Sequence, residues 1–172
     1  MEIIRIPEER IRILIGQNGK TKKEIENKAG VELKISKDGE VAIEGSEDKV
    51  YFSKEIIKAI GRGFSPKIAL KLLKDEKTLE IINLKEFGNT QNAIKRIKAR
   101  IIGEEGKVKK EIESATDSDI SIYGNTIGII ANYDCVDYSK QAVMKIISGA
   151  EHSTVFNYLS EVKRKLFQER LK

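Results

Sequence analysis

Two Gly-x-x-Gly segments hold the residues of this sequence that are best placed to do chemistry. The first consists of Gly16, Gln17, Asn18 and Gly19; apolar residues 13–15 precede it, and Lys20, Lys22 and Lys23 follow it. Such a turn between two helices brings backbone N–H groups and basic side chains together at a helix N-terminus, which is a favourable place for a phosphate. The segment therefore predicts a site for a phosphate backbone.

The second segment lies 87 residues later and consists of Gly103, Glu104, Glu105 and Gly106, followed by Lys107, Lys109 and Lys110. The sequence Lys-Lys-Glu-Ile-Glu at 22–26 returns at 109–113 with the same offset. The offset indicates a duplicated unit.

The pattern around each segment predicts the same order of elements. In the first unit we expect a strand at 2–6, helices at 8–14 and 20–29, strands at 31–35 and 41–43, and a helix at 49–60 capped by Ser46. In the second we expect a strand at 79–82, a helix at 91–101, the turn, a helix, strands at 120–122 and 127–130, and a closing helix. This β-α-α-β-β-α order with a Gly-x-x-Gly turn is typical of a type I KH domain, whose loop clamps four nucleotides.

The sequence thus predicts an α+β protein of two type I KH domains packed together, with a C-terminal helix. We expect the first domain at 1–62, a helical linker at 63–76, the second domain at 77–150 and the terminal helix at 151–172. The terminal helix is amphipathic, so it either packs on the second domain or is offered to a partner.

Composition excludes several classes of function. The net charge of +5 does not by itself establish a nucleic-acid partner, although residues 10–23 hold five basic residues and no acidic one. His152 and Cys135 are the sole histidine and cysteine, so a zinc site with the usual ligands cannot be assembled, and we expect no catalytic triad. We expect no catalytic residue, metal or cofactor, no membrane segment, and a cytoplasmic protein that is not an enzyme. A ribonuclease that uses only carboxylates and Mg²⁺ remains an alternative.

The predicted RNA contacts surround the two turns. We expect an apolar groove for the bases, formed by Ile13, Ile15, Ile25, Leu33 and Ile35, although these side chains could simply be core. Lys34 and Ser36 could meet base edges. The residues expected to contact RNA are Arg12, Ile15, Gly16, Gln17, Asn18, Gly19, Lys20, Lys22, Lys23, Leu33, Lys34, Ile35, Arg100, Gly103, Glu104, Glu105, Gly106, Lys107, Lys109 and Lys110.

The two turns differ in charge. Gln17 and Asn18 are neutral, whereas Glu104 and Glu105 place two carboxylates where a phosphate would pass. Nearby basic residues oppose this effect, so the second unit either binds RNA or serves as a packing or protein-binding module. We expect that aspartate at both Gly16 and Gly19 abolishes most single-stranded RNA binding and leaves the fold intact.

The two units, the junction at 59–66 and the segment at 149–153 resemble the archaeal tandem-KH ribosome-assembly proteins, relatives of the eukaryotic "partner of Nob one" factor. The resemblance implies binding to single-stranded RNA at the 3′ end of small-subunit rRNA. It also implies contact with the endonuclease that trims that end and with the alpha subunit of translation initiation factor two. The hypothesis is therefore an RNA-binding ribosome-assembly factor; the alternative is a protein-docking adaptor with secondary RNA binding.

Overall fold

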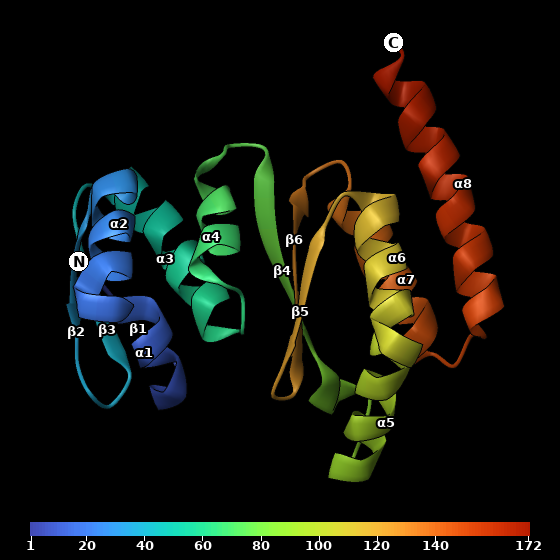
Figure 1. The fold of residues 1–172 in the computed structure, drawn as a ribbon, viewed down its shortest axis with the longest axis horizontal. Coiled ribbons are helices and arrows are strands. Elements are labelled where there is room, and N and C mark those ends of the chain that lie inside the picture. The colour runs from blue at the N-terminus through green and yellow to red at the C-terminus, as the bar shows by residue number, and fades with distance from the viewer. The chain divides into compact units, whose positions relative to one another are not determined.

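The computed structural model describes residues 1–172. The chain folds into two compact units, Met1–Leu79 and Glu80–Lys172. Each unit contributes a three-stranded sheet with helices on one of its faces (Figure 1). No helix combines the length and the apolar character that crossing a membrane requires.

The first unit has the expected order of elements. They are β1 (Glu2–Arg5), α1 (Glu8–Ile15), α2 (Lys20–Ala29), β2 (Glu32–Ile35), β3 (Glu40–Glu44) and α3 (Glu47–Gly61). The sheet order is β1-β3-β2, and both pairs of neighbours are antiparallel. The predicted α+β fold is confirmed for this unit.

Alternation along the strands decides which side chains of the first unit form its core. Leu33 of β2 and Ile43 of β3 are opposite one another and are 1% and 0% exposed. Lys34 pairs with Ala42 and lies on the other face of the sheet, because successive residues of a strand point to opposite faces. Leu14 and Ile56 complete the core from α1 and α3.

The segment expected as a linker is folded onto α3 within the first unit. It forms α4 (Pro66–Ala69) and a 3-10 turn, η2 (Leu70–Leu73), and it buries Phe64, Ala69 and Leu72. Ser65 caps α4 by accepting a hydrogen bond from the N–H of Ile68 at 3.3 Å.

Ser46 occupies the N-cap position of α3, as expected, but its side chain does not cap the helix. Ser46 makes no capping hydrogen bond to the backbone, and its hydroxyl instead donates to the Asp48 carboxylate at 2.7 Å. Glu47 and Asp48 supply negative charge in the first turn, where the helix dipole favours it.

The second unit repeats the order. Its elements are β4 (Lys77–Asn83), which crosses the boundary between the units, a 3-10 turn η3 (Leu84–Glu86), α5 (Gln91–Ile102), α6 (Lys107–Thr116), β5 (Asp119–Tyr123), β6 (Thr126–Asn132) and α7 (Val136–Ile147). The sheet order β4-β6-β5 matches β1-β3-β2 of the first unit. The duplication therefore extends to the topology.

The terminal helix α8 (His152–Arg170) belongs to the second unit. Val155, Leu159, Val162 and Leu166 are buried in the same core as the second sheet, and α8 packs against α6 and α7 (Figure 1). Of the two expectations for this helix, packing on the second unit is confirmed.

Candidate nucleic-acid interface

The first Gly-x-x-Gly turn joins α1 to α2 through left-handed backbone. Gly16, Asn18 and Gly19 have φ values of 73°, 55° and 74°, and the N–H of Gly16 donates to the carbonyl of Arg12 at 2.9 Å. No side chain caps the N-terminus of α2, and its first turn contains no acidic residue. The first N–H groups of α2 are therefore available to an anion.

The second turn, between α5 and α6, has the same backbone conformation. Gly103, Glu105 and Gly106 have φ values of 74°, 55° and 75°. The N-terminus of α6 is likewise without a side-chain cap or an acidic residue in its first turn. Both units thus present the same backbone, and only the side chains at the two middle positions set the turns apart.

The first glycine of each turn is required by packing. A Cβ on Gly16 would overlap the Thr21 hydroxyl and lie 2.9 Å from the Thr21 nitrogen, and a Cβ on Gly103 would meet Val108 in the same way. A Cβ on Gly19 would meet nothing within 4 Å. A side chain at Gly16 therefore strains the turn, contrary to the expectation that aspartate there leaves the fold undisturbed, whereas the open space at Gly19 lets another backbone approach.

A repeated glutamate joins the helix after each turn to the strand that follows it, and sequence reasoning missed its role. Glu26 accepts a hydrogen bond from the N–H of Leu33 at 2.9 Å, and Glu113 accepts one from the N–H of Ile120 at 3.1 Å. Each glutamate thereby ties the helix after the turn to the next strand. The signal was present, since Glu26 and Glu113 keep the 87-residue offset.

The same glutamates also engage one lysine of each turn. The Lys22 ammonium nitrogen lies 3.6 Å from a carboxylate oxygen of Glu26, and that of Lys109 lies 3.2 Å from a carboxylate oxygen of Glu113. These two lysines are therefore partly neutralised before any ligand binds.

Other basic side chains beside the turns are exposed and have no ion-pair partner. They are Arg12, Lys20 and Lys23 in the first unit and Lys107 and Lys110 in the second. With the uncapped N–H groups, they give each turn a local positive potential that suits a phosphate backbone.

The apolar groove is smaller than expected. Leu33 and Ile25 are 1% and 0% exposed, so these two side chains are core and have no surface to offer a base. Ile15 and Ile35 are half-buried, and Ile13 is 40% exposed. Of the predicted lining, only these last three residues can reach a ligand.

Lys34 and Ser36 are not directed at the turn. Lys34 lies on the sheet face opposite Leu33, and its ammonium group is 3.0 Å from the Glu44 carboxylate. That hydrogen bond and charge raise the pKa of Lys34. The Ser36 hydroxyl is hydrogen-bonded to the Asp38 carboxylate.

Arg100 stabilises the fold instead of facing a ligand. Its guanidinium donates to the carbonyl of Ile146 at 2.7 Å and to that of Ala150, just beyond the end of α7. The His152 ring is hydrogen-bonded to the carbonyl of Arg100 at 2.9 Å. The expectation that Arg100 contacts RNA is therefore corrected.

Replacing Arg100 with alanine should lower the free energy of unfolding by about 2 kcal/mol, because two half-buried carbonyls lose a charged donor. Urea denaturation would measure the loss. Lys95→Ala, on the exposed side of the same helix, is the control and should change stability by less than about 0.5 kcal/mol. Equal stability of the two variants would show that the guanidinium contributes nothing.

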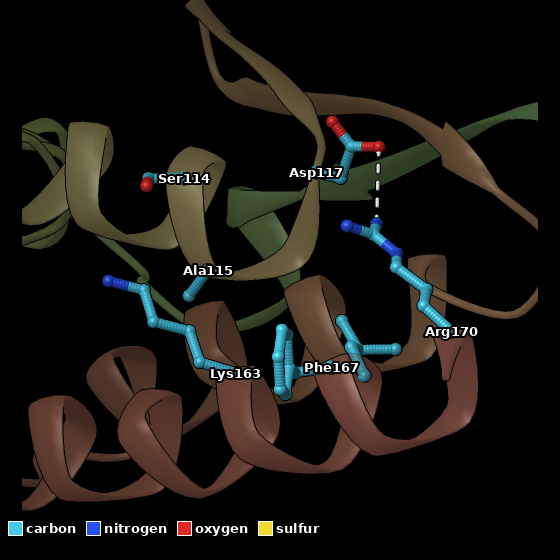
Figure 2. Close-up of a pocket in the computed structure, with 7 residues that line it drawn as sticks. Ser114, Ala115, Asp117, Lys163, Phe167 and Arg170 are labelled. Carbon is cyan, nitrogen blue, oxygen red and sulfur yellow. Dashed lines mark ion pairs between the residues drawn. The ribbon is translucent and has the colours of Figure 1, made fainter. Parts of the chain in front are cut away.

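A shallow hollow between α6 and α8 has a different character. Figure 2 shows Lys163, Phe167 and Arg170 of α8 on one side, and Ser114, Ala115 and Asp117 on the other. Asp117 pairs with Arg170 at 3.6 Å. The residues that line the hollow carry charges of both signs, and these charges are paired. The hollow is therefore not suited to a phosphate backbone.

Comparison with known families agrees with this geometry. Residues 78–164 match a family model for the second KH domain of PNO1, described as a eukaryotic type KH domain (KH-domain type I), and residues 1–59 match the general KH domain model. The chain belongs to the KH-domain family, and its second unit is a PNO1-type KH domain.

Individual relatives extend the match to both KH domains. A KH domain-containing protein of Methanocaldococcus jannaschii is 41% identical over 99% of this chain and 77% of its own length. The pre-rRNA-processing protein PNO1 of Chaetomium thermophilum is 26% identical over 66% of this chain, which spans under half (45%) of that protein.

A solved structure shares the fold of both KH domains. It is a chain of the crystal structure of an a/eIF2alpha–aDim2p–rRNA complex from Pyrococcus horikoshii. That chain has a TM-score of 0.89 and 38% sequence identity, over 95% of this chain and 94% of the other.

Proposed function

We propose that this protein binds single-stranded RNA through its two Gly-x-x-Gly turns and acts, without catalysing a reaction, as a factor in the assembly of the small ribosomal subunit. The observation that carries the proposal is the repeated turn, in which uncapped helix N–H groups and unpaired lysines meet twice. At the second glycine a Cβ would meet nothing within 4 Å at Gly19, and at Gly106 only the flexible Lys110 side chain at 3.8 Å. This combination suits a chain of phosphates better than a single small ligand.

A clamp on the backbone favours single strands. The turn contacts phosphates, while the half-buried Ile15 and Ile35 offer an apolar surface to unpaired bases. Aromatic residues make up only 6% of the chain and tryptophan is absent, so stacking platforms play little part. Affinity should therefore depend strongly on salt, with a slope near −0.7 for each phosphate contact on a single strand.

The proposal that the bound RNA is ribosomal is supported by similar proteins. PNO1 of Chaetomium thermophilum is a pre-rRNA-processing protein, and the matching Pyrococcus structure is a complex with rRNA. The 3′ region of small-subunit rRNA is our specific proposal within that class.

Two protein partners belong to the proposal. The Pyrococcus complex contains a/eIF2alpha, which supports the alpha subunit of initiation factor two as a partner of this chain. The endonuclease that trims the rRNA 3′ end is the second. An adaptor function is the second candidate, favoured by Phe167 and Leu171, which are 65% and 71% exposed on and just after α8.

Fluorescence anisotropy tests the proposal with three RNAs: the single-stranded 3′ end of small-subunit rRNA, a scrambled sequence, and the 3′ end paired in a duplex. We expect the single-stranded rRNA sequence to bind most tightly and its affinity to fall steeply with salt. Equal and weak binding of all three RNAs would contradict the RNA function and favour the adaptor.

A further inference from the structure

The first strand of the first unit, β1, forms an open edge of its sheet. It pairs only with β3, since the sheet order is β1-β3-β2. The N–H of Ile6 donates to the carbonyl of Gly39 at 2.9 Å, and the antiparallel register then directs the N–H and C=O groups of Ile4 toward β3 as well. The N–H and C=O groups of Ile3 and Arg5 therefore point away from the sheet, and none of them has a hydrogen-bond partner within the chain.

The charged side chains of β1 do not block this edge. Many proteins protect an exposed edge strand with unpaired charges. In β1, however, the Arg5 guanidinium lies 2.7 Å from the Glu40 carboxylate, and the Glu2 carboxylate lies 3.4 Å from the Lys54 ammonium group. Between them, Ile3 is 57% exposed. The edge thus presents unpaired backbone groups and an apolar side chain, and both of its charged side chains are paired within the unit.

A hollow of about 390 Å³ lies between the start of β1 and α3, and we call it the β1–α3 hollow. The residues that give it its character are Glu2, Glu47, Val50, Tyr51 and Lys54. Val50 is 5% exposed and forms the apolar floor, whereas Tyr51 is 64% exposed and stands at the rim. Glu47 is exposed and has no ion-pair partner.

The β1–α3 hollow suits a basic side chain. Its one cation, Lys54, is paired with Glu2, so the carboxylate of Glu47 remains without a counterion. The exposed ring of Tyr51 can receive a guanidinium or ammonium group on its face. A phosphate would meet the repulsion of the carboxylates, so the hollow is not suited to RNA.

We propose that an extended, basic segment of a partner protein binds the edge of β1 as a fourth strand of the first sheet. Strand addition of this kind takes its affinity from main-chain hydrogen bonds and its specificity from alternate side chains. Ile3 and Arg5 together offer two N–H and two C=O groups. The proposal goes beyond the RNA function and does not depend on it.

The alternation of side chains along an added strand defines the chemistry of the segment. Glu2 lies on the sheet face that the helices cover, as its ion pair with Lys54 of α3 shows, so the residue opposite Glu2 reaches the β1–α3 hollow and should be arginine or lysine. The residue opposite Ile3 lies on the other face, beside Ile3 and Ala42, and should be apolar and β-branched. The segment should therefore alternate basic and apolar residues.

A second copy of β1 does not have this pattern. If two β1 strands paired antiparallel about Ile3, each would place Ile4 opposite Glu2 of the other. No basic residue would then reach the β1–α3 hollow, and Glu47 would stay unpaired. Charge complementarity therefore favours a different, basic chain over a second copy.

Phage display tests the inference with random twelve-residue peptides selected on the full chain. The most enriched peptides are then synthesised with a fluorescent label and titrated by anisotropy. Ile3→Pro removes the outward N–H and leaves every bond to β3, because proline is tolerated where the N–H of an edge strand faces solvent. Ile3→Val, which keeps the N–H, is the matched control.

We expect enriched peptides in which arginine or lysine alternates with β-branched residues. Ile3→Pro should weaken their binding by about tenfold, because a hydrogen bond is lost and the ring holds the segment away, and Ile3→Val should not change it. Glu47→Gln should weaken binding by about threefold, as for a surface ion pair. Glu161→Gln, at an exposed and unpaired glutamate of α8, should have no effect. Thermal unfolding and RNA affinity should stay the same in all four variants.

Amide hydrogen exchange of the unsubstituted chain gives a second readout, which does not depend on how the proline variant folds. The bound peptide should slow exchange at Ile3 and Arg5 by about tenfold, because their outward N–H groups become hydrogen-bonded. Exchange along α8 should stay the same.

Three results would overturn the inference. Unchanged exchange at Ile3 and Arg5 in the complex, or equal binding of the peptides by a folded Ile3→Pro variant, would overturn strand addition. Enrichment of acidic peptides, or of none, would overturn the basic partner. A dimer in light scattering that Ile3→Pro dissociates would overturn the proposal in favour of a second copy of the chain.

Discussion

Exchanging Gln17 and Asn18 for glutamate should weaken binding of four-nucleotide RNA by about 30-fold in a protein that remains folded. Each new carboxylate lies beside the phosphate path and adds about 1 kcal/mol of repulsion, so two add about 2 kcal/mol. The fold should tolerate the change because Glu105 already occupies the position equivalent to Asn18 at the same φ of 55°. The second domain thus supplies a natural precedent for the substituted turn.

Fluorescence anisotropy measures the effect, and thermal unfolding confirms that the variant is folded. The reciprocal exchange, Glu104→Gln with Glu105→Asn, is the matched control, and it should strengthen binding at the second turn by a similar factor. If both exchanges leave affinity unchanged while the proteins remain folded, the phosphates do not pass the turns.

Replacing Gly16 with alanine should lower the free energy of unfolding of the first unit by about 3 kcal/mol. The new Cβ overlaps Thr21, and the backbone keeps φ at 73° and ψ at 179°, a region that side chains avoid. Strain of this kind costs about 1 to 3 kcal/mol, and overpacking adds a similar amount.

Gly19→Ala provides the comparison within the same turn. Its φ is also positive, but its Cβ would meet nothing within 4 Å, so the cost should be about 1 kcal/mol. Urea denaturation distinguishes the two variants. Equal losses would mean that the contact with Thr21 does not constrain the turn.

Local patterns predicted most of the fold. The helix at 20–29 coincides with α2, and Gly30 ends it in the left-handed conformation. The 87-residue offset predicted the second unit, because it aligned strands, turns and helices together. Helix ends and strands depend on residues that are neighbours in the sequence, and a repeat is visible in the sequence itself.

The errors arose where long-range packing decides the outcome. Leu33 is buried because β2 directs its side chain toward the helices. Arg100 donates hydrogen bonds to carbonyls that are 46 and 50 residues away in sequence. Their shared positive charge could not show that Arg100 and Lys95 have different roles, since only the fold shows which of them has a hydrogen-bond partner.

The central claim is that the backbone N–H groups of the two turns hold RNA. A titration of ¹⁵N-labelled protein with single-stranded small-subunit rRNA 3′ end, followed by two-dimensional NMR, tests it most directly. We expect the largest amide shifts at residues 16–23 and 103–110. Shifts concentrated on α8, with both turns unaffected, would contradict the claim.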